Sequence, residues 1–226
     1  MNRDGRHDRP VAPSTGPQAV ISDFGGVLTS PLAGAFSAFE AHSGVPLVEL
    51  GRAMAAEGVR RGVNPLFELE TGRLTETEFL DDLSRQLSRQ LRREVSLDGF
   101  GERYFADLEP NTRVIDYMRE LGSRGYRLAI CTNNVREWEP RWRAMLPVDQ
   151  IFEVVVDSAF VGVRKPEPRI YELTLEALGV APQDAIFLDD IEINCEAARA
   201  LGMITVWFRS SEQALEEIES ILQGHR

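Results

Sequence analysis

The chain has 226 residues, 43% of them hydrophobic, which is enough to bury one good-sized domain or a core domain with a modest insert. Its formal net charge of −11 comes without a long lysine or arginine run, which makes nucleic acids and anionic membranes poor partners. No apolar run approaches the roughly 18 residues of a membrane span. Cys131 and Cys195 lack C-x-x-C spacing, so reduced thiols are expected rather than a disulfide framework.

The first segment, residues 1–17, is polar and proline-containing and has no apolar core of the kind found in a secretory signal. We expect a disordered tail and a cytoplasmic protein. An apolar run then leads into Asp23, and glycines and Pro31 follow it. This pattern predicts that Asp23 ends a buried strand at a turn.

Residues 33–108 carry apolar side chains at helical spacing and lack strand-like β-branched runs. Thr75 and Glu78 are spaced as a capping box before an apolar pair. The stretch is therefore predicted to be a helical insert, with turns at 58–62 and at Gly72.

Beyond the insert, strands and helices alternate. The expected strands are 126–131, 152–157, 185–188 and 204–208, and the expected helices are 113–121, 167–178, 192–201 and 212–222. Repeated units with apolar strands favour an α/β fold with a parallel sheet covered on both faces. We predict an α/β core built from 18–32 and 109–226, with 33–108 inserted into it.

Polar side chains stand where several of these strands end, and the ends of parallel strands meet along one edge of a sheet. These candidates are Asp23, Thr132, Asn133, Asp189, Asp190 and Asn194, with Lys165 in the segment 164–166 that is expected to begin the helix after the third strand. Several carboxylates at one point suit a hard divalent ion such as Mg²⁺. Lysine, hydroxyl and backbone N–H groups beside them would suit phosphoryl transfer, with an aspartate as nucleophile.

Each candidate also has an ordinary interpretation. A lone strand-ending aspartate is usually a turn residue or a helix cap, Thr132-Asn133 a turn, and Lys165 a solvated surface residue. Only the adjacent acids Asp189-Asp190, which follow an apolar strand, need a functional explanation on their own. The ordered set is far more specific than any member of it.

In that order, the candidates resemble the four motifs of the haloacid dehalogenase superfamily over about residues 18–210. The first motif reads Asp23-Phe-Gly25-Gly26-Val-Leu, the second is Thr132, the third Lys165-Pro166, and the fourth Asp189-Asp190 with Asn194. The nearest subgroup resembles the epoxide-hydrolase N-terminal-domain phosphatases and their sugar-phosphatase relatives. The resemblance implies a Rossmann-like core with an inserted helical (C1-type) cap.

The resemblance also implies roles for these residues. Asp23 attacks phosphorus, Thr132 and Asn133 hold the phosphoryl group, and Lys165 neutralises charge. Asp190, Asp23 and the Gly25 backbone carbonyl would hold Mg²⁺, supported by Asp189 and Asn194. The substrate would be a small phosphorylated metabolite, and a sugar phosphate is one option. Whether the protein forms a homodimer is left open.

Gly25 departs from the family pattern, which usually has a second aspartate there that protonates the leaving group. Losing a general acid–base group costs about 10²- to 10⁴-fold in rate. A slow phosphatase, a substrate with a good leaving group, a substitute Glu or His from the cap, and a weakly active or inactive phosphate-binding or regulatory protein all remain open. A 2-haloacid dehalogenase is less favoured, because that metal-free chemistry leaves Asp189-Asp190 unexplained.

Overall fold

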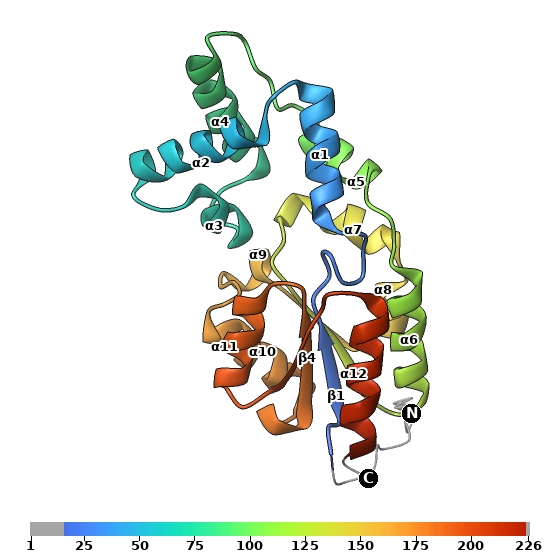
Figure 1. The fold of residues 1–226 in the computed structure, drawn as a ribbon. Coiled ribbons are helices and arrows are strands. Elements are labelled where there is room, and N and C mark those ends of the chain that lie inside the picture. The colour runs from blue at the N-terminus through green and yellow to red at the C-terminus, as the bar shows by residue number, and fades with distance from the viewer. Residues whose placement is uncertain (1–15, 225–226) are drawn as a thin grey trace, which may run out of the picture.

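In the computed structural model, residues 16–224 are described, so the tail predicted over 1–17 lies almost entirely outside the described residues. The chain forms an α/β core with a group of helices above it (Figure 1). The core sheet has five parallel strands in the order β3-β2-β1-β4-β5, which confirms the predicted α/β fold. Its strands are β1 (Ala19–Ser22), β2 (Arg127–Thr132), β3 (Val154–Asp157), β4 (Ala185–Asp189) and β5 (Ile204–Trp207).

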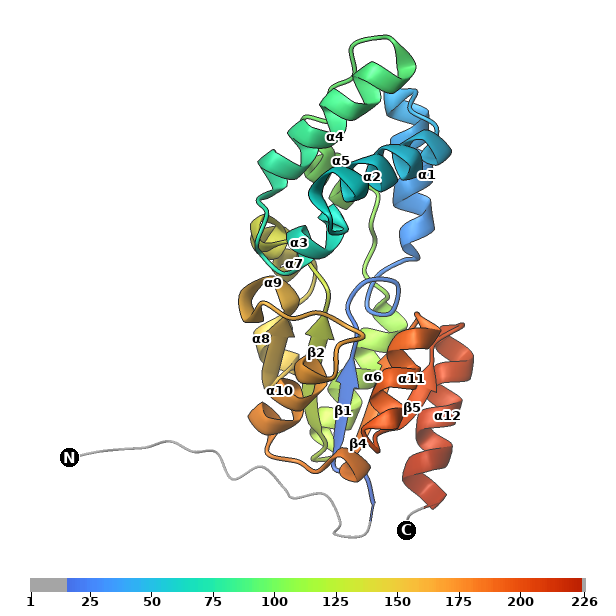
Figure 2. The same cartoon turned by 90° about the vertical axis from the view of Figure 1, so that its left-hand side faces the viewer.

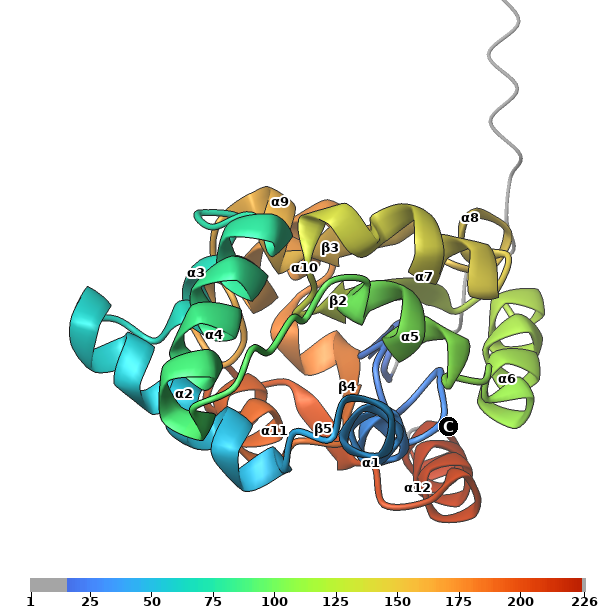
Figure 3. The ribbon, with the colours of Figure 1, turned by 90° about the horizontal axis from the view of Figure 1, so that it is seen from above.

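Helices cover both faces of this sheet (Figure 3). One face packs against α6 (Thr112–Ser123), α7 (Glu139–Met145), α8 (Val148–Ile151) and α12 (Ser211–Gly224). The other packs against α10 (Pro168–Leu178) and α11 (Glu192–Ala200). Short elements complete the core: α9 (Ser158–Val161) and the 3₁₀ turns η1 (Arg136–Trp138) and η2 (Pro182–Asp184).

The central strand β1 shows why the sheet is buried on both sides. Its side chains alternate between the two faces, so that Val20 joins one hydrophobic cluster while Ala19 and Ile21 join the other. All four residues of the strand are buried. This double burial explains the continuous apolar run that the sequence shows before Asp23.

The inserted segment is helical, as predicted. It consists of α1 (Leu32–Ser43), α2 (Leu47–Arg61), α3 (Pro65–Glu70), α4 (Glu76–Leu91) and α5 (Phe100–Ala106), which we call the cap. The Thr75–Glu78 capping box is present: Glu78 N donates to Thr75 Oγ1 at 3.2 Å, and Thr75 N donates to Glu78 Oε2 at 3.0 Å.

One predicted turn in the cap is wrong in part. Helix α2 continues through Gly58 and ends at Gly62, which takes the left-handed conformation with φ 75°. A single glycine inside a helix costs only about 1 kcal/mol, so the amphipathic pattern of α2 overrides it. Gly72 does lie in a turn, with φ 66°.

The cap stands above the carboxyl ends of the strands (Figure 2). The two connections between cap and core lie side by side, where Thr29 and Pro110 form an isolated antiparallel bridge. Ser30 N donates to Glu109 O at 2.7 Å, and Asn111 Nδ2 donates to Val27 O at 2.9 Å. The cap is therefore fixed at its base directly beside the turn that follows Asp23.

Candidate active site

The centre of the site is a buried lysine between two aspartates. Strands β1 and β4 are parallel neighbours with Ser22 opposite Leu188, so the residues that follow, Asp23 and Asp189, come to lie together. Lys165 Nζ lies 2.8 Å from Asp23 Oδ1 and 2.6 Å from Asp189 Oδ2. The lysine side chain is only 1% exposed. Three residues that are far apart in sequence thus form one ion-paired group.

Burial sets the protonation behaviour of this group. Burial raises the pKa of Asp23 to about 7, and the nearby Lys165 ammonium opposes part of that rise. Burial alone would lower the pKa of Lys165, but the adjacent Asp189 and Asp23 carboxylates outweigh it, so the pKa lies above its ordinary value. Lys165 is therefore a fixed positive charge at any physiological pH.

Asp190 adds a third carboxylate beside this pair. Carboxylate oxygens of Asp23, Asp189 and Asp190 all lie within 4.8 Å of one another. Burial, followed by the charge of Asp189, raises the pKa of Asp190 to about 6. Three acids with one lysine leave excess negative charge, and such an oxygen-rich cluster fits a hard divalent cation.

Hydrogen bonds give the two adjacent acids different roles. Asp189 is fully buried, and its Oδ1 accepts from Asn194 Nδ2 at 3.0 Å and from Ile191 N at 2.8 Å. Its Oδ2 pairs with Lys165 Nζ, so both carboxylate oxygens of Asp189 are bonded. Asp190 is less buried than Asp189. The geometry suits Asp190 as a direct metal ligand and Asp189 as its support.

The predicted phosphate-binding residues lie at the end of β2. Thr132 ends that strand and is buried, and Thr132 and Asn133 both line a cavity above the sheet. The Asn133 side chain bonds to the backbone of Lys165 in both directions. The peptide bond between Lys165 and Pro166 is cis. Lys165 lies three residues before α10, and α9 lies between β3 and Lys165 in the chain. Our expectation that Lys165 begins that helix is wrong, because Pro168 at the first helical position starts it later.

Gly25 lies in the turn above β1 and lines the same cavity. A β-carbon placed there would come 3.3 Å from Leu32 Cδ1, a tight but mobile neighbour. At Gly26, with φ +76°, a β-carbon would lie 2.4 Å from Asp190 Oδ2. The second glycine is thus required by the close approach of an acid, whereas the first leaves room for a small side chain.

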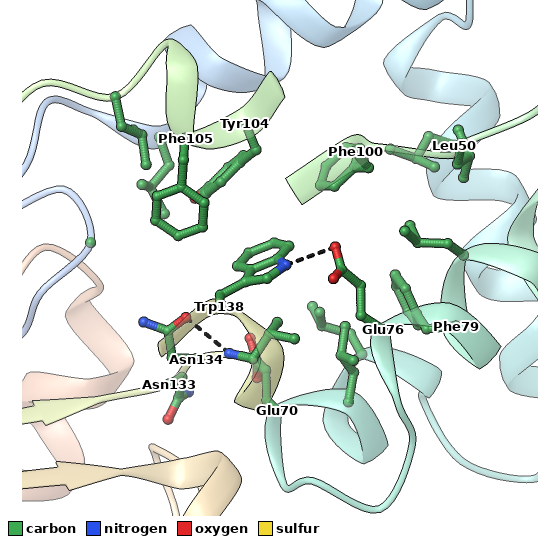
Figure 4. A pocket seen from close by; sticks show the side chains of 18 of the residues that line it. Leu50, Glu70, Glu76, Phe79, Phe100, Tyr104, Phe105, Asn133, Asn134 and Trp138 are labelled. Atoms are coloured by element: carbon green, nitrogen blue, oxygen red, sulfur yellow. Dashed lines mark hydrogen bonds between the residues drawn. The ribbon is translucent and has the colours of Figure 1, made fainter. Parts of the chain in front are cut away.

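The cavity has a volume of about 710 Å³ and lies between the cap and the core. Figure 4 shows Trp138 of the core between Tyr104, Phe105 and Phe100 of the cap. Trp138 Nε1 donates to Glu76 Oε1 at 2.8 Å. Trp138 therefore joins the cap to the core and lines the cavity.

A partly buried ion pair at the cap–core boundary was not predicted from the sequence. Arg164 Nε lies 2.6 Å from Glu70 Oε2, and the Arg164 guanidinium sits 4.0 Å from the centre of the Phe67 ring. Each charged side chain is 15% exposed. The only signal was the position of Arg164 directly before Lys165, since nothing in the sequence pairs it with a cap residue 94 positions away.

Comparison with known proteins agrees with this arrangement. A family model described as haloacid dehalogenase-like hydrolase matches residues 17–202. The chain is 31% identical over 187 residues to phosphatase MT3486 of Mycobacterium tuberculosis, covering 82% of this chain and 84% of that protein. It is 30% identical over 211 residues to acyl-CoA dehydrogenase family member 10 of Mus musculus, covering 91% of this chain but only 19% of that longer protein.

A similar fold occurs in the HAD family enzyme bt-2542 from Bacteroides thetaiotaomicron, solved in complex with magnesium and inorganic phosphate. That structure has a TM-score of 0.63 and 24% sequence identity, covering 84% of this chain and 93% of the other. Among the described residues, no helix combines the length and apolar character needed to cross a bilayer. The matched motifs, the parallel sheet and the relatives agree: the chain belongs to the haloacid dehalogenase-like hydrolase family.

Proposed function

We propose that this hydrolase is a magnesium-dependent phosphoric monoester hydrolase that acts on a small phosphorylated metabolite. The observation that carries the proposal is the buried group of Asp23, Lys165 and Asp189, with Asp190 beside it. A nucleophilic carboxylate next to a fixed cation and a divalent-ion site is what phosphoryl transfer requires. The relative named as a phosphatase supports the same reaction.

In this proposal, Asp23 attacks phosphorus and forms an aspartyl phosphate. Lys165 holds the carboxylate in place and offsets the charge that gathers on the phosphoryl oxygens. Thr132 and the backbone N–H of Asn133 orient that group from the end of β2. Asp23, Asp190 and the Gly25 carbonyl would hold Mg²⁺, which when bound supplies positive charge to the phosphoryl group. Asp189 accepts hydrogen bonds from Lys165 and Asn194, and these bonds hold the lysine in position.

Because residue 25 is glycine, the site lacks the aspartate that usually protonates the leaving group in this family. The two carboxylates that line the cavity are already engaged, Glu70 with Arg164 and Glu76 with Trp138. Neither replaces a free acid at position 25. The proposed enzyme therefore depends on the leaving oxygen being a stable anion in its own right.

The test is hydrolysis of p-nitrophenyl phosphate and of a sugar-phosphate panel with and without Mg²⁺. We expect turnover that disappears with EDTA and in Asp23→Asn. Asp149→Asn, a change to an exposed aspartate far from the strand ends, is the matched control and should keep full activity. Absence of turnover on every ester, with phosphate still bound, would favour the binding-protein alternative. Metal-free halide release from a 2-haloacid would favour the dehalogenase alternative.

Three other expectations stay proposals. They are the cytoplasmic location, the absence of nucleic-acid and membrane partners, and the sugar phosphate as one substrate option. The first two rest on composition and charge. The third depends on the chemistry of the cavity lining in the cap.

A further inference from the structure

The cavity above the phosphate site has an apolar, aromatic lining. It runs from Gly25, Thr132 and Asn133 at the sheet to Leu50 and Phe79 in the cap (Figure 4). Its volume of about 710 Å³ is that of a site for a drug-sized molecule. A space of this size is far larger than a phosphoryl group needs, so most of it is available to the organic part of a substrate.

An aromatic cluster forms part of the lining of this space. The rings of Tyr104 and Phe100 stack on Trp138 with interplanar angles of 25° and 24° and centroid distances of 5.1 and 6.2 Å. Phe105 meets Trp138 edge-on, with centroids 5.4 Å apart. Such surfaces bind planar, apolar groups through offset or edge-to-face contacts.

Charged and polar groups on the lining argue against a hydrophilic substrate. Among the described residues that line the cavity, none is lysine, arginine or histidine, and its charged members are Glu70 and Glu76. Both are engaged, with Arg164 and Trp138. A second phosphate or a carboxylate would find no basic side chain on the described lining and would lie near the Glu70 and Glu76 carboxylates. The uncharged polar residues of the lining, Thr29, Ser37, Thr132, Asn133 and Asn134, are outnumbered by apolar ones, so a sugar would place most of its hydroxyls against apolar surface.

The leaving group gives an independent argument. Gly25 provides no acid, and burial raises the pKa of the Tyr104 phenol above its ordinary value, which makes it a weak proton donor. A leaving oxygen must then depart largely unprotonated. A phenol with a pKa of about 10 forms a far better leaving anion than an alcohol, whose pKa is close to the value of about 16 for water.

We propose that the substrate is the phosphate monoester of a phenol, with its aromatic body held against Trp138 in the cavity. This inference rests on the proposed phosphatase function and narrows it. The Asp23 oxygen bonds to phosphorus, and the phosphorus–aryl oxygen bond breaks with its electron pair on the phenolate, which takes a proton from solvent. Water then adds to the phosphorus of the aspartyl phosphate, frees Asp23 and gives inorganic phosphate. The net reaction is aryl phosphate plus water giving phenol plus phosphate.

The first experiment separates leaving group from shape in the full-length protein with Mg²⁺. Three esters are compared: 2-naphthyl phosphate, 2-naphthylmethyl phosphate, which keeps the ring but leaves as an alkoxide, and glucose 6-phosphate. We expect kcat/KM for 2-naphthyl phosphate to exceed both others by at least about 100-fold, the lower range of a missing acid. Equal or higher kcat/KM for glucose 6-phosphate would overturn the inference while leaving the phosphatase function intact. No turnover of these esters or of acetyl phosphate, an acyl phosphate with a still better leaving group, would instead refute the phosphatase itself.

The second experiment tests whether the cavity holds the ring. Leu50→Trp fills its far end and should lower kcat/KM for 2-naphthyl phosphate about tenfold relative to acetyl phosphate. Val48→Trp, two residues earlier on α2 and 60% exposed, is the matched control and should not change that ratio. An unchanged ratio in Leu50→Trp would contradict the assignment.

A third measurement needs no variant, so it stands even if Leu50→Trp fails to fold. In the wild-type protein, 2-naphthol should inhibit acetyl phosphate hydrolysis competitively, because it occupies the cavity beside the phosphate site. Glucose at the same concentration should not inhibit. Absence of inhibition by 2-naphthol would overturn the proposal.

Discussion

The side-chain amide of Asn133 holds the backbone of Lys165 through two hydrogen bonds. Asn133 Nδ2 donates to Lys165 O at 3.0 Å, and Lys165 N donates to Asn133 Oδ1 at 2.8 Å. These bonds join the end of β2 to the loop that carries the Lys165 ammonium group. Asn133 acts on phosphate through its backbone N–H in the proposed mechanism, and its side chain positions Lys165.

Asn133→Ala should therefore lower kcat about 10- to 100-fold, because a small displacement of a catalytic group is costly. The backbone N–H survives the change, so KM for phosphate esters should move little. Steady-state kinetics on p-nitrophenyl phosphate would check this. The matched control is Asn64→Ala, which removes a helix-capping amide on α3 and should reduce stability by about 1 kcal/mol without reducing kcat. A normal kcat in Asn133→Ala would refute the positioning role.

Gly26→Ala should remove most Mg²⁺-dependent activity. The new β-carbon would lie 2.4 Å from Asp190 Oδ2, so the proposed metal ligand has to move. We expect a loss of at least about 100-fold in kcat/KM, in line with losing electrostatic stabilisation of the transition state. Titration of Mg²⁺ against activity measures the effect.

Gly62→Ala separates that clash from backbone strain. Gly62 has φ +75°, nearly the same as the +76° of Gly26, but a β-carbon there meets nothing within 4 Å. It should lower the melting temperature as Gly26→Ala does while leaving activity intact. Equal activity losses in both variants would show that strain, and not Asp190, is responsible.

Gly25→Asp should restore a general acid. The β-carbon would come 3.3 Å from Leu32 Cδ1, which the flexible end of that side chain can accommodate by a shift of a few tenths of an ångström. We expect kcat on 2-naphthylmethyl phosphate to rise about tenfold or more and kcat on 2-naphthyl phosphate to change little, since only the poor leaving group needs a proton. Gly25→Asn, equal in size but without an acid, should show no gain. Equal effects of the two changes would mean that shape matters and proton donation does not.

Asp157 should make stability depend on pH. Its Oδ1 accepts from Ala159 N at 2.9 Å, its Oδ2 is buried without a partner, and burial raises its pKa to about 7. Because the folded-state pKa lies above the unfolded value of about 4, the stabilisation is complete below pH 4 and is lost as pH rises through 7.

Asp157→Asn keeps a capping side chain and removes this titration. Between pH 5 and pH 8, the free energy of unfolding of the wild type should fall by about 2 kcal/mol more than that of the variant. Urea unfolding at the two pH values measures it. Asp149→Asn, at an exposed aspartate, is the control and should track the wild type. Parallel pH profiles for Asp157→Asn and the wild type would contradict the prediction.

The sequence predicted the sheet and the meeting of the candidate residues at its carboxyl edge, because both depend on local patterns. The apolar run before Asp23 and the paired acids after β4 mark strand ends, and parallel pairing brings such ends together. The one-turn helix α9 was not predicted, since four residues carry too little periodicity to identify a helix.

The walls of the cavity were beyond the reach of the sequence. Trp138 and Glu76 are 62 positions apart and belong to core and cap, and their contact depends on how the five cap helices close over the sheet. Which faces of those helices look inward follows from tertiary packing, and the apolar spacing alone does not settle it. The aromatic character of the site therefore emerged only from the fold.

Trp138 gives the protein a built-in optical reporter. Its indole belongs to the core yet stacks on Tyr104 and Phe100 of the cap and donates to Glu76. Of the other two tryptophans, Trp142 is fully buried in the core, and Trp207 ends strand β5, where its Nε1 donates to Asp190 O. Any separation of cap from core must change the surroundings of Trp138 first, so its emission can time cap movement during turnover without an added label.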